Sequence, residues 1–126
     1  MRVELTRTYR FEAARHLTGL PPEHICSGTH GHSFRLRLYL EGEIDPDSGI
    51  LQDYADIDTV VQEKLVLLDH KYINRVGEDL SDALLQNPTN ERLCKWFWDN
   101  LKPRLPLLQR VELAETPEST AAYWGQ

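Results

Sequence analysis

The stretch Cys26-Ser-Gly-Thr-His30-Gly-His32-Ser-Phe-Arg-Leu-Arg-Leu-Tyr-Leu40 decides how this chain folds and where its chemistry lies. Its second half alternates apolar and polar residues, which is the period of a half-buried β-strand. Its first half holds one thiol and two imidazoles in a glycine-containing turn. Because residues two apart on a strand point to the same face, His30 and His32 are expected on one face at the strand entrance.

Two imidazoles on one face form half of a metal site, and histidine nitrogen suits zinc, copper, iron or nickel. With a third histidine and an open coordination position, a bound zinc ion would be catalytic and not structural. The alternative interpretation of His30 and His32 is a pair of surface histidines that lie close together by chance.

Length and composition predict one α+β domain over residues 1–126 and exclude several function classes. The net charge is −6 and no block of lysine or arginine occurs, which argues against nucleic acid as a partner. No apolar run of about 18 residues suggests a membrane span, and the N-terminus lacks the apolar core of a signal peptide. Cys26 and Cys94 define no disulfide framework, so we expect free thiols and a cytoplasmic location.

Hydrophobic periodicity predicts four strands and two helices. The expected elements are strands over residues 3–14, 32–42, 111–115 and 121–124, a helix from Asp56 or Asp58 to Asp69-His70, a loop over 71–87, and a helix capped by Thr89 and stopped by Pro103 and Pro106. Segregated strands and helices indicate an antiparallel sheet with the helices on one face.

Further candidates for chemistry are a thiol and two acidic positions. Cys26 could be a base or nucleophile if a cation lies near it, although a lone cysteine is usually inert. Asp69 and His70 place a carboxylate beside an imidazole, which suits a proton relay but is also a common pair. Glu115 ends an apolar strand and could be a solvated strand end. Cys94 lies on the apolar side of a helix and is expected to be inert.

These residues occur together in one order. The motifs are Phe11-Glu-Ala-Ala14, Cys26-x-x-x-His30-Gly-His32-Ser-Phe34, Leu68-Asp-His70 with Asn74, Asn87-Pro-Thr-x-Glu91 and Val111-x-x-x-Glu115. This order resembles the 6-pyruvoyl-tetrahydropterin synthase superfamily over essentially the whole chain. A cysteine four residues before His-Gly-His is most similar to the bacterial 6-carboxy-tetrahydropterin synthases of queuosine biosynthesis.

The resemblance implies the tunnelling fold, a four-stranded antiparallel sheet with two helices on one face, assembled into trimers or dimers of trimers. It also implies a Zn²⁺ ion held by three histidines, of which His30 and His32 are two. It assigns Cys26 as general base, Asp69 and His70 as its relay, Glu115 as the anchor of the pterin ring, and Thr89 and Glu91 as further substrate contacts.

One departure from the family pattern concerns the first zinc ligand. The family reads Phe-x-Ala-Ala-His-Arg-Leu, whereas this chain reads Phe-Glu-Ala-Ala-Arg15-His16-Leu. Arg15 therefore falls where the first ligand is expected. His16 has the opposite strand parity and can reach the metal only if the strand has ended or bulged. We expect His16 as the third ligand, with His24 as the alternative.

The implied activity is a lyase reaction that converts 7,8-dihydroneopterin triphosphate to 6-carboxy-5,6,7,8-tetrahydropterin, acetaldehyde and triphosphate. The alternatives are a 6-pyruvoyl-tetrahydropterin synthase, which releases triphosphate without acetaldehyde, and a non-catalytic pterin-binding homologue. The Arg15-His16 order is the feature that favours the last of these.

A small antiparallel sheet leaves two edges uncovered, and pairing with other copies would cover them. We therefore predict a homo-oligomer built on trimers, with the active site at a subunit boundary. Light scattering at micromolar concentration should give at least three times the mass of one chain, and a monomer mass would contradict this.

Overall fold

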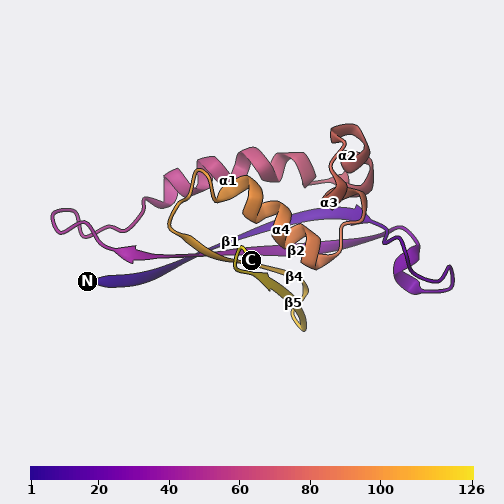
Figure 1. The fold of residues 1–126 in the computed structure, drawn as a ribbon, viewed down its shortest axis with the longest axis horizontal. Coiled ribbons are helices and arrows are strands. Elements are labelled where there is room, and N and C mark those ends of the chain that lie inside the picture. Colours follow the sequence, from indigo (N-terminus) through magenta and orange to yellow (C-terminus); the bar gives the residue numbers. More distant parts are fainter.

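Two long neighbouring strands, β1 and β2, form the spine of the structure, a computed structural model that describes residues 1–126 (Figure 1). The other elements pack beside or across this pair. The strands are β1 (Arg2–Arg15), β2 (His30–Glu43), β3 (Lys71–Tyr72), β4 (Leu108–Thr116) and β5 (Ser119–Tyr123). The helices are a 3-10 turn (Ile25–Ser27), α1 (Tyr54–Leu68), α2 (Ile73–Leu80), α3 (Ala83–Gln86) and α4 (Asn90–Leu101).

The sheet has five strands in the order β3-β1-β2-β4-β5, not the four that the sequence predicts. The four predicted strands are present and pair antiparallel, with Arg2 opposite Glu43 and Arg15 opposite His30 at the two ends of the long hairpin. The additional strand β3 pairs parallel to β1 beside Ala13 and Ala14. Two residues are too few to show an alternation, so periodicity could not reveal this strand.

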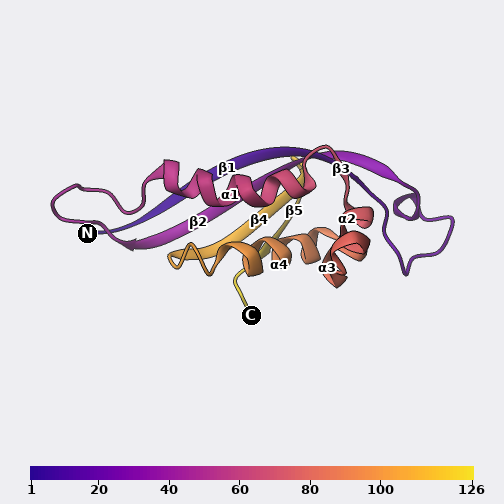
Figure 2. The same ribbon diagram turned by 90° about the horizontal axis from the view of Figure 1, so that it is seen from above.

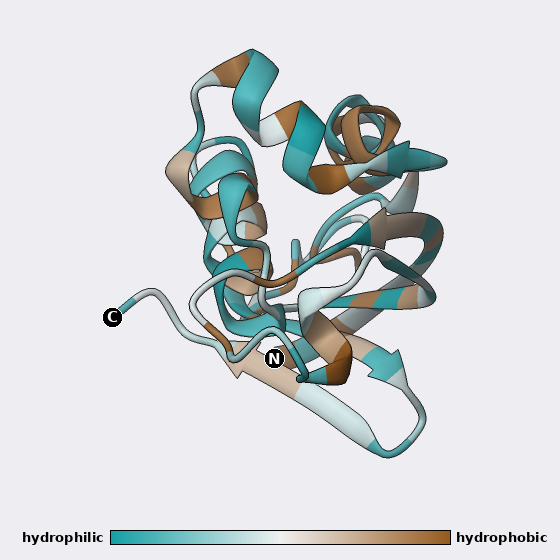
Figure 3. Ribbon diagram, turned by 90° about the vertical axis from the view of Figure 1, so that its right-hand side faces the viewer, coloured by the Kyte–Doolittle hydropathy of each residue, from teal (hydrophilic) through white to brown (hydrophobic).

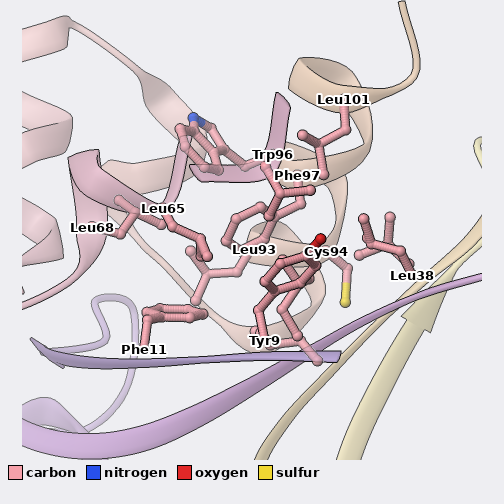
Figure 4. Packing of buried hydrophobic residues seen from close by; sticks show 14 of the residues in the cluster. Tyr9, Phe11, Leu38, Leu65, Leu68, Leu93, Cys94, Trp96, Phe97 and Leu101 are labelled. Atoms are coloured by element: carbon pink, nitrogen blue, oxygen red, sulfur yellow. The ribbon is translucent and has the colours of Figure 1, made fainter. Parts of the chain in front are cut away.

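Helices α1 and α4 cover one face of the sheet and run in opposite directions (Figure 2). Apolar and polar residues are interleaved along them, as expected for helices with one buried face (Figure 3). One cluster of 23 buried residues fills the space between helices and sheet. Figure 4 shows Phe11 of β1 facing Leu65 and Leu68 of α1 and Phe97 of α4. None of the helices combines the length and apolarity that crossing a membrane requires.

The expected loop over residues 71–87 is wrong, because this segment contains β3, α2 and α3. Helix α2 has no side-chain cap and includes Gly77, and both features weaken a helix signal in the sequence. Tertiary packing compensates for this weakness. The position that a Cβ atom would take on Gly77 is 2.6 Å from the backbone nitrogen of Gln86, so α2 and α3 approach each other closely there.

The start of α1 also differs from the expectation. Asp53, and neither Asp56 nor Asp58, caps the helix by accepting a hydrogen bond from the Ala55 amide. Asp58 instead accepts from Arg7 of β1 at 2.7 Å, which explains why an arginine interrupts the apolar face of that strand. The predicted cap of α4 is confirmed, because the Thr89 side chain accepts from the amide of the third helical residue.

Replacing Gly77 by alanine should destabilise the protein, because the new methyl group would collide with the backbone of α3. We expect the free energy of unfolding to fall by about 1–3 kcal/mol, as for other overpacked sites. Urea denaturation measures this. The control is Gly28→Ala, where the nearest atom is 3.9 Å away and the φ angle is negative, and which should change little. Equal effects of the two substitutions would contradict the packing of α2 on α3.

Candidate functional site

The candidate site lies where β1 ends and β2 begins. The connecting segment 16–29 extends beyond the end of the sheet and returns through the 3-10 turn (Figures 1 and 2). A backbone hydrogen bond of 2.8 Å from Leu17 to Cys26 closes the base of this excursion. The hairpin register places His32 opposite Ala13 and His30 opposite Arg15. The thiol and both imidazoles are thus held at one end of the sheet.

A cavity of about 270 Å³ brings together four of the predicted site residues, Cys26, His30, His32 and Glu115. The rings of His30 and His32 lie on one side of β2, with centroids 4.8 Å apart and planes nearly perpendicular, as their spacing predicts. Glu115, near the end of β4, reaches the same cavity, and its Oε2 atom lies 3.3 Å from Nε2 of His32. The two halves of the candidate site come from residues 83 positions apart (115 minus 32) and meet because β4 pairs with β2.

Hydrogen bonds determine what each imidazole can do. Nδ1 of His30 lies 2.8 Å from the carbonyl oxygen of Gly28. Since a carbonyl can only accept, this nitrogen carries the proton and Nε2 keeps its lone pair. Burial lowers the pKa of His32, and the charge of Arg15 lowers it further. His32 is therefore neutral at pH 7 and can donate one hydrogen bond and accept another.

Arg15 is the residue whose contacts in the site were least predictable from the sequence. Its side chain is 3% exposed and points to the helix-covered face of the sheet. One guanidinium nitrogen, Nη2, donates to Oε2 of Glu115 at 2.5 Å. The other, Nη1, donates at 2.8 Å to the carbonyl of Pro88 and at 2.8 Å to Oδ1 of Asn90, while the charge lies 5.0 Å from the ring centre of Phe34.

Arg15 therefore connects the end of β1, the end of β4 and the start of α4. Burial lowers the pKa of Arg15, and the negative charge of Glu115 opposes this shift. An arginine stays charged at neutral pH in either case. Its Nε atom has no hydrogen-bond partner, which is uncommon for a buried donor. The signal in the sequence was present, as an arginine on the apolar parity of a strand.

His16 does not join His30 and His32. Its backbone amide donates to Oδ1 of Asn74 at 2.9 Å, and its ring Nδ1 contacts the hydroxyl group of Tyr72. The alternative ligand, His24, accepts a hydrogen bond from the Cys26 amide at 3.0 Å and lies exposed. The strand ends at Arg15, which is the condition under which His16 could have reached the metal. The ring of His16 nevertheless contacts Tyr72 and does not line the cavity.

The arrangement of these side chains does not fit the expected zinc site. A catalytic zinc ion normally has three protein ligands and one open position. No group of three or more histidine, cysteine, aspartate or glutamate side chains lies close enough to hold a metal. His30 meets the requirements of a ligand, since its Nδ1 is hydrogen bonded and its Nε2 is free. The zinc site that the resemblance implies therefore has only two of its three donors, His30 and His32, in one place.

Asp69 and His70 form the predicted pair, but in a different cavity from Cys26. Asp69 accepts from the Glu12 amide at 2.9 Å and lies 2.9 Å from Nδ1 of His70. His70, which has a φ of 61° and a mostly exposed side chain, lines a cavity of about 550 Å³ with Glu12, Lys71 and Tyr72. This cavity shares Gly31 and His32 with the one that contains Cys26. Within one chain, the relay and the thiol are separated.

Thr89 and Glu91 line neither cavity. Thr89 caps α4, and Glu91 lies exposed in the first turn of that helix. Asn90, between them, contacts the site through Arg15. Their predicted role as substrate contacts stays a prediction.

Comparisons with known proteins identify the family to which the chain belongs. A family model described as 6-pyruvoyl tetrahydropterin synthase matches residues 4–126. A 6-carboxy-5,6,7,8-tetrahydropterin synthase from Synechocystis is 33% identical over an alignment of 131 residues. The alignment covers 94% of this chain and 91% of the relative. The human 6-pyruvoyl tetrahydrobiopterin synthase is 31% identical over 100 residues, which cover 77% of this chain and 67% of the relative.

A structural comparison gives the same result. The 6-pyruvoyl tetrahydropterin synthase of Caenorhabditis elegans superposes with a TM-score of 0.88 at 26% sequence identity, over 100% of this chain and 97% of that one. The expected fold is therefore confirmed, with one strand more than the sequence predicts.

The two thiols should differ in reactivity. Cys26 is partly exposed in its cavity, whereas burial raises the pKa of Cys94 to about 12. Because the thiolate is the reactive form, iodoacetamide at neutral pH should label Cys26 and leave Cys94 unmodified in the folded protein. Peptide mass spectrometry measures both sites, and urea-unfolded protein, labelled at both, is the control. Equal labelling of the two cysteines in the native protein would contradict the packing of α4.

Proposed function

The chain belongs to the 6-pyruvoyl tetrahydropterin synthase family, and we propose that it is a lyase acting on 7,8-dihydroneopterin triphosphate. The proposed products, with one water consumed, are 6-carboxy-5,6,7,8-tetrahydropterin, acetaldehyde and triphosphate. The observation that carries this proposal is the convergence of Cys26, His30, His32 and Glu115 on one cavity. That cavity combines an acceptor for a heterocycle with groups that can move protons.

Glu115 suits the role of pterin anchor. Its Oε2 atom is taken by Arg15 and faces His32, while its Oε1 atom has no hydrogen-bond partner within the chain. The edge of a pterin ring presents an amino group and a ring N–H group, and an ionised carboxylate accepts strongly from such donors. The ion pair with Arg15 supports the proposal, because it fixes the orientation of the carboxylate.

Cys26 and His30 suit proton transfer beside the bound ring. The reaction requires protons to leave and return to carbon atoms of the substrate side chain, and a thiol and an imidazole are both able to exchange protons near neutral pH. His30 presents an unprotonated Nε2 atom, and Cys26 shares its cavity. Positioned groups of this kind typically contribute about 10²–10⁴-fold to the rate.

Asp69 and His70 enter the proposal through assembly. Since His70 lies in a different cavity from Cys26, we propose that the His70 serving this thiol comes from a neighbouring copy of the chain. We place the complete active site at a boundary between subunits of a trimer or a dimer of trimers. The proposed location of the enzyme is the cytoplasm.

Three observations bear on the choice among the possible functions. The relative from Synechocystis, which covers 94% of the chain, carries the name 6-carboxy-5,6,7,8-tetrahydropterin synthase. The alternative, a 6-pyruvoyl-tetrahydropterin synthase, has support from the human relative. A non-catalytic pterin-binding role has support from Arg15, which stands at the position expected for a metal ligand.

Incubation with 7,8-dihydroneopterin triphosphate and analysis of the products separates these three. The proposal predicts equal amounts of acetaldehyde and triphosphate. Triphosphate without acetaldehyde would indicate the pyruvoyl-forming reaction, and binding without either product would indicate the non-catalytic role. Either of these results would contradict the proposed activity.

Variants test the assigned roles in the same assay. Cys26→Ala should lose about 10²–10⁴-fold in turnover while keeping pterin affinity, as expected for an acid–base group. Cys94→Ala, which removes the buried thiol, is the matched control and should keep turnover. Glu115→Gln should chiefly weaken binding of 7,8-dihydroneopterin, whereas Glu118→Gln, at an exposed position, should not. Unchanged affinity in Glu115→Gln would show that the anchor lies elsewhere.

A further inference from the structure

Arg15 occupies the interior position that an incoming metal ligand would need. It is the inward-facing residue directly opposite His30 in the hairpin, and only 2% of its surface is exposed. Phe34 lies beneath its guanidinium group, at 5.0 Å from the ring centre. We propose that Arg15 closes this site to zinc and holds Glu115 and His32 in place itself, so that the pterin ligand binds without a metal.

The first step of the argument concerns the donor atoms. Oε2 of Glu115 accepts from Nη2 of Arg15 at 2.5 Å and lies 3.3 Å from Nε2 of His32. Glu115 is the carboxylate that lines this cavity. Its charge is already paired with Arg15 and is therefore not available to balance a metal ion bound at His32.

The second step concerns charge. Arg15 carries a permanent positive charge in a buried position, and like charges that are close and shielded from water repel strongly. A divalent cation between His30 and His32 would lie beside this guanidinium group, which stands directly opposite His30.

The third step concerns the missing ligand. Asn74 binds the backbone of His16 through both atoms of its amide group, at 2.9 Å each, and the His16 ring contacts Tyr72. Asn74 is itself buried, and its amide also donates to Gln86 of α3 at 3.2 Å. Asn74 therefore fixes the backbone of His16 in the position from which its ring contacts Tyr72 and does not line the cavity.

What remains for a ligand is a metal-free set of groups. Oε1 of Glu115 is free to accept, Nε2 of His30 carries a lone pair, and Cys26 adds a thiol. This set favours a neutral heterocycle with adjacent N–H donors, which is the edge of a pterin. The choice of a pterin as ligand rests on the proposed function, whereas the exclusion of zinc does not.

Zinc content of the purified protein tests the inference without any assay of turnover. The wild-type chain is incubated with excess ZnSO₄, desalted and analysed by inductively coupled plasma mass spectrometry. We expect far less than one zinc per chain. Retention of about one zinc per chain, as in a complete site, would overturn the inference if His32→Ala abolished it.

Arg15→His provides the gain-of-function arm. It removes the cation and adds a third imidazole on the face of His30 and His32, so it should bind about one zinc per chain, as a three-histidine site does. Arg10→His, the same change at an exposed position of β1, is the matched control and should bind none. A folded Arg15→His protein that fails to gain zinc would show that Arg15 is not what excludes the metal, and would overturn the inference.

Ligand binding provides the last arm, which does not depend on how Arg15→His folds. The affinity of wild-type protein for 7,8-dihydroneopterin, measured by fluorescence titration, should be the same with and without EDTA. A loss of affinity in EDTA that zinc restores would overturn the inference. Absence of turnover would count against the proposed activity alone, so the two failures are distinguishable.

Discussion

The ion pair between buried Arg15 and partly buried Glu115 is the interaction on which the candidate site depends. It joins the last residue of β1 to the end of β4, and the remaining guanidinium nitrogen joins both to the start of α4 through Pro88 and Asn90. Burying a charge is costly unless it is paired and hydrogen bonded. This chain meets that condition with three hydrogen bonds and one aromatic face, and leaves one donor unpaired. In this arrangement the Arg15 side chain lacks the conformational freedom of a surface arginine, and the carboxylate of Glu115 is fixed in position.

The fold explains why such distant residues meet. The long hairpin β1–β2 sets the register that places Arg15 opposite His30, and β4 pairs with β2 so that Glu115 arrives beside His32. The long hairpin also provides the apolar base of the site, where Phe34 of β2 stacks on Phe11 of β1 with ring centroids 4.9 Å apart. The face of the sheet opposite α1 and α4 carries no helix (Figure 1), which is consistent with the proposed contact between copies of the chain.

Much of this could be predicted from the sequence, because alternation in the strands and the His-x-His spacing are local signals. The four main strands, the cap at Thr89 and the shared face of His30 and His32 follow from them. The grouping of Cys26 and Glu115 with these histidines was implied by the family resemblance. What could not be predicted depends on tertiary contacts. Helix α2 forms against α3 despite Gly77, and the ring of His16 turns to Tyr72. An arginine on an apolar parity gives no indication of its partners until the fold supplies them.

The central claim is that Arg15 and Glu115 act as one unit, and a double-mutant cycle tests it most directly. The free energy of unfolding is measured by urea denaturation for the wild type, Arg15→Met, Glu115→Gln and the double variant. Interacting pairs show coupling of about 0.5–3 kcal/mol, and we expect a value in the upper half of that range. Additivity of the two single changes to within about 0.3–0.5 kcal/mol, the value for independent sites, would contradict the account.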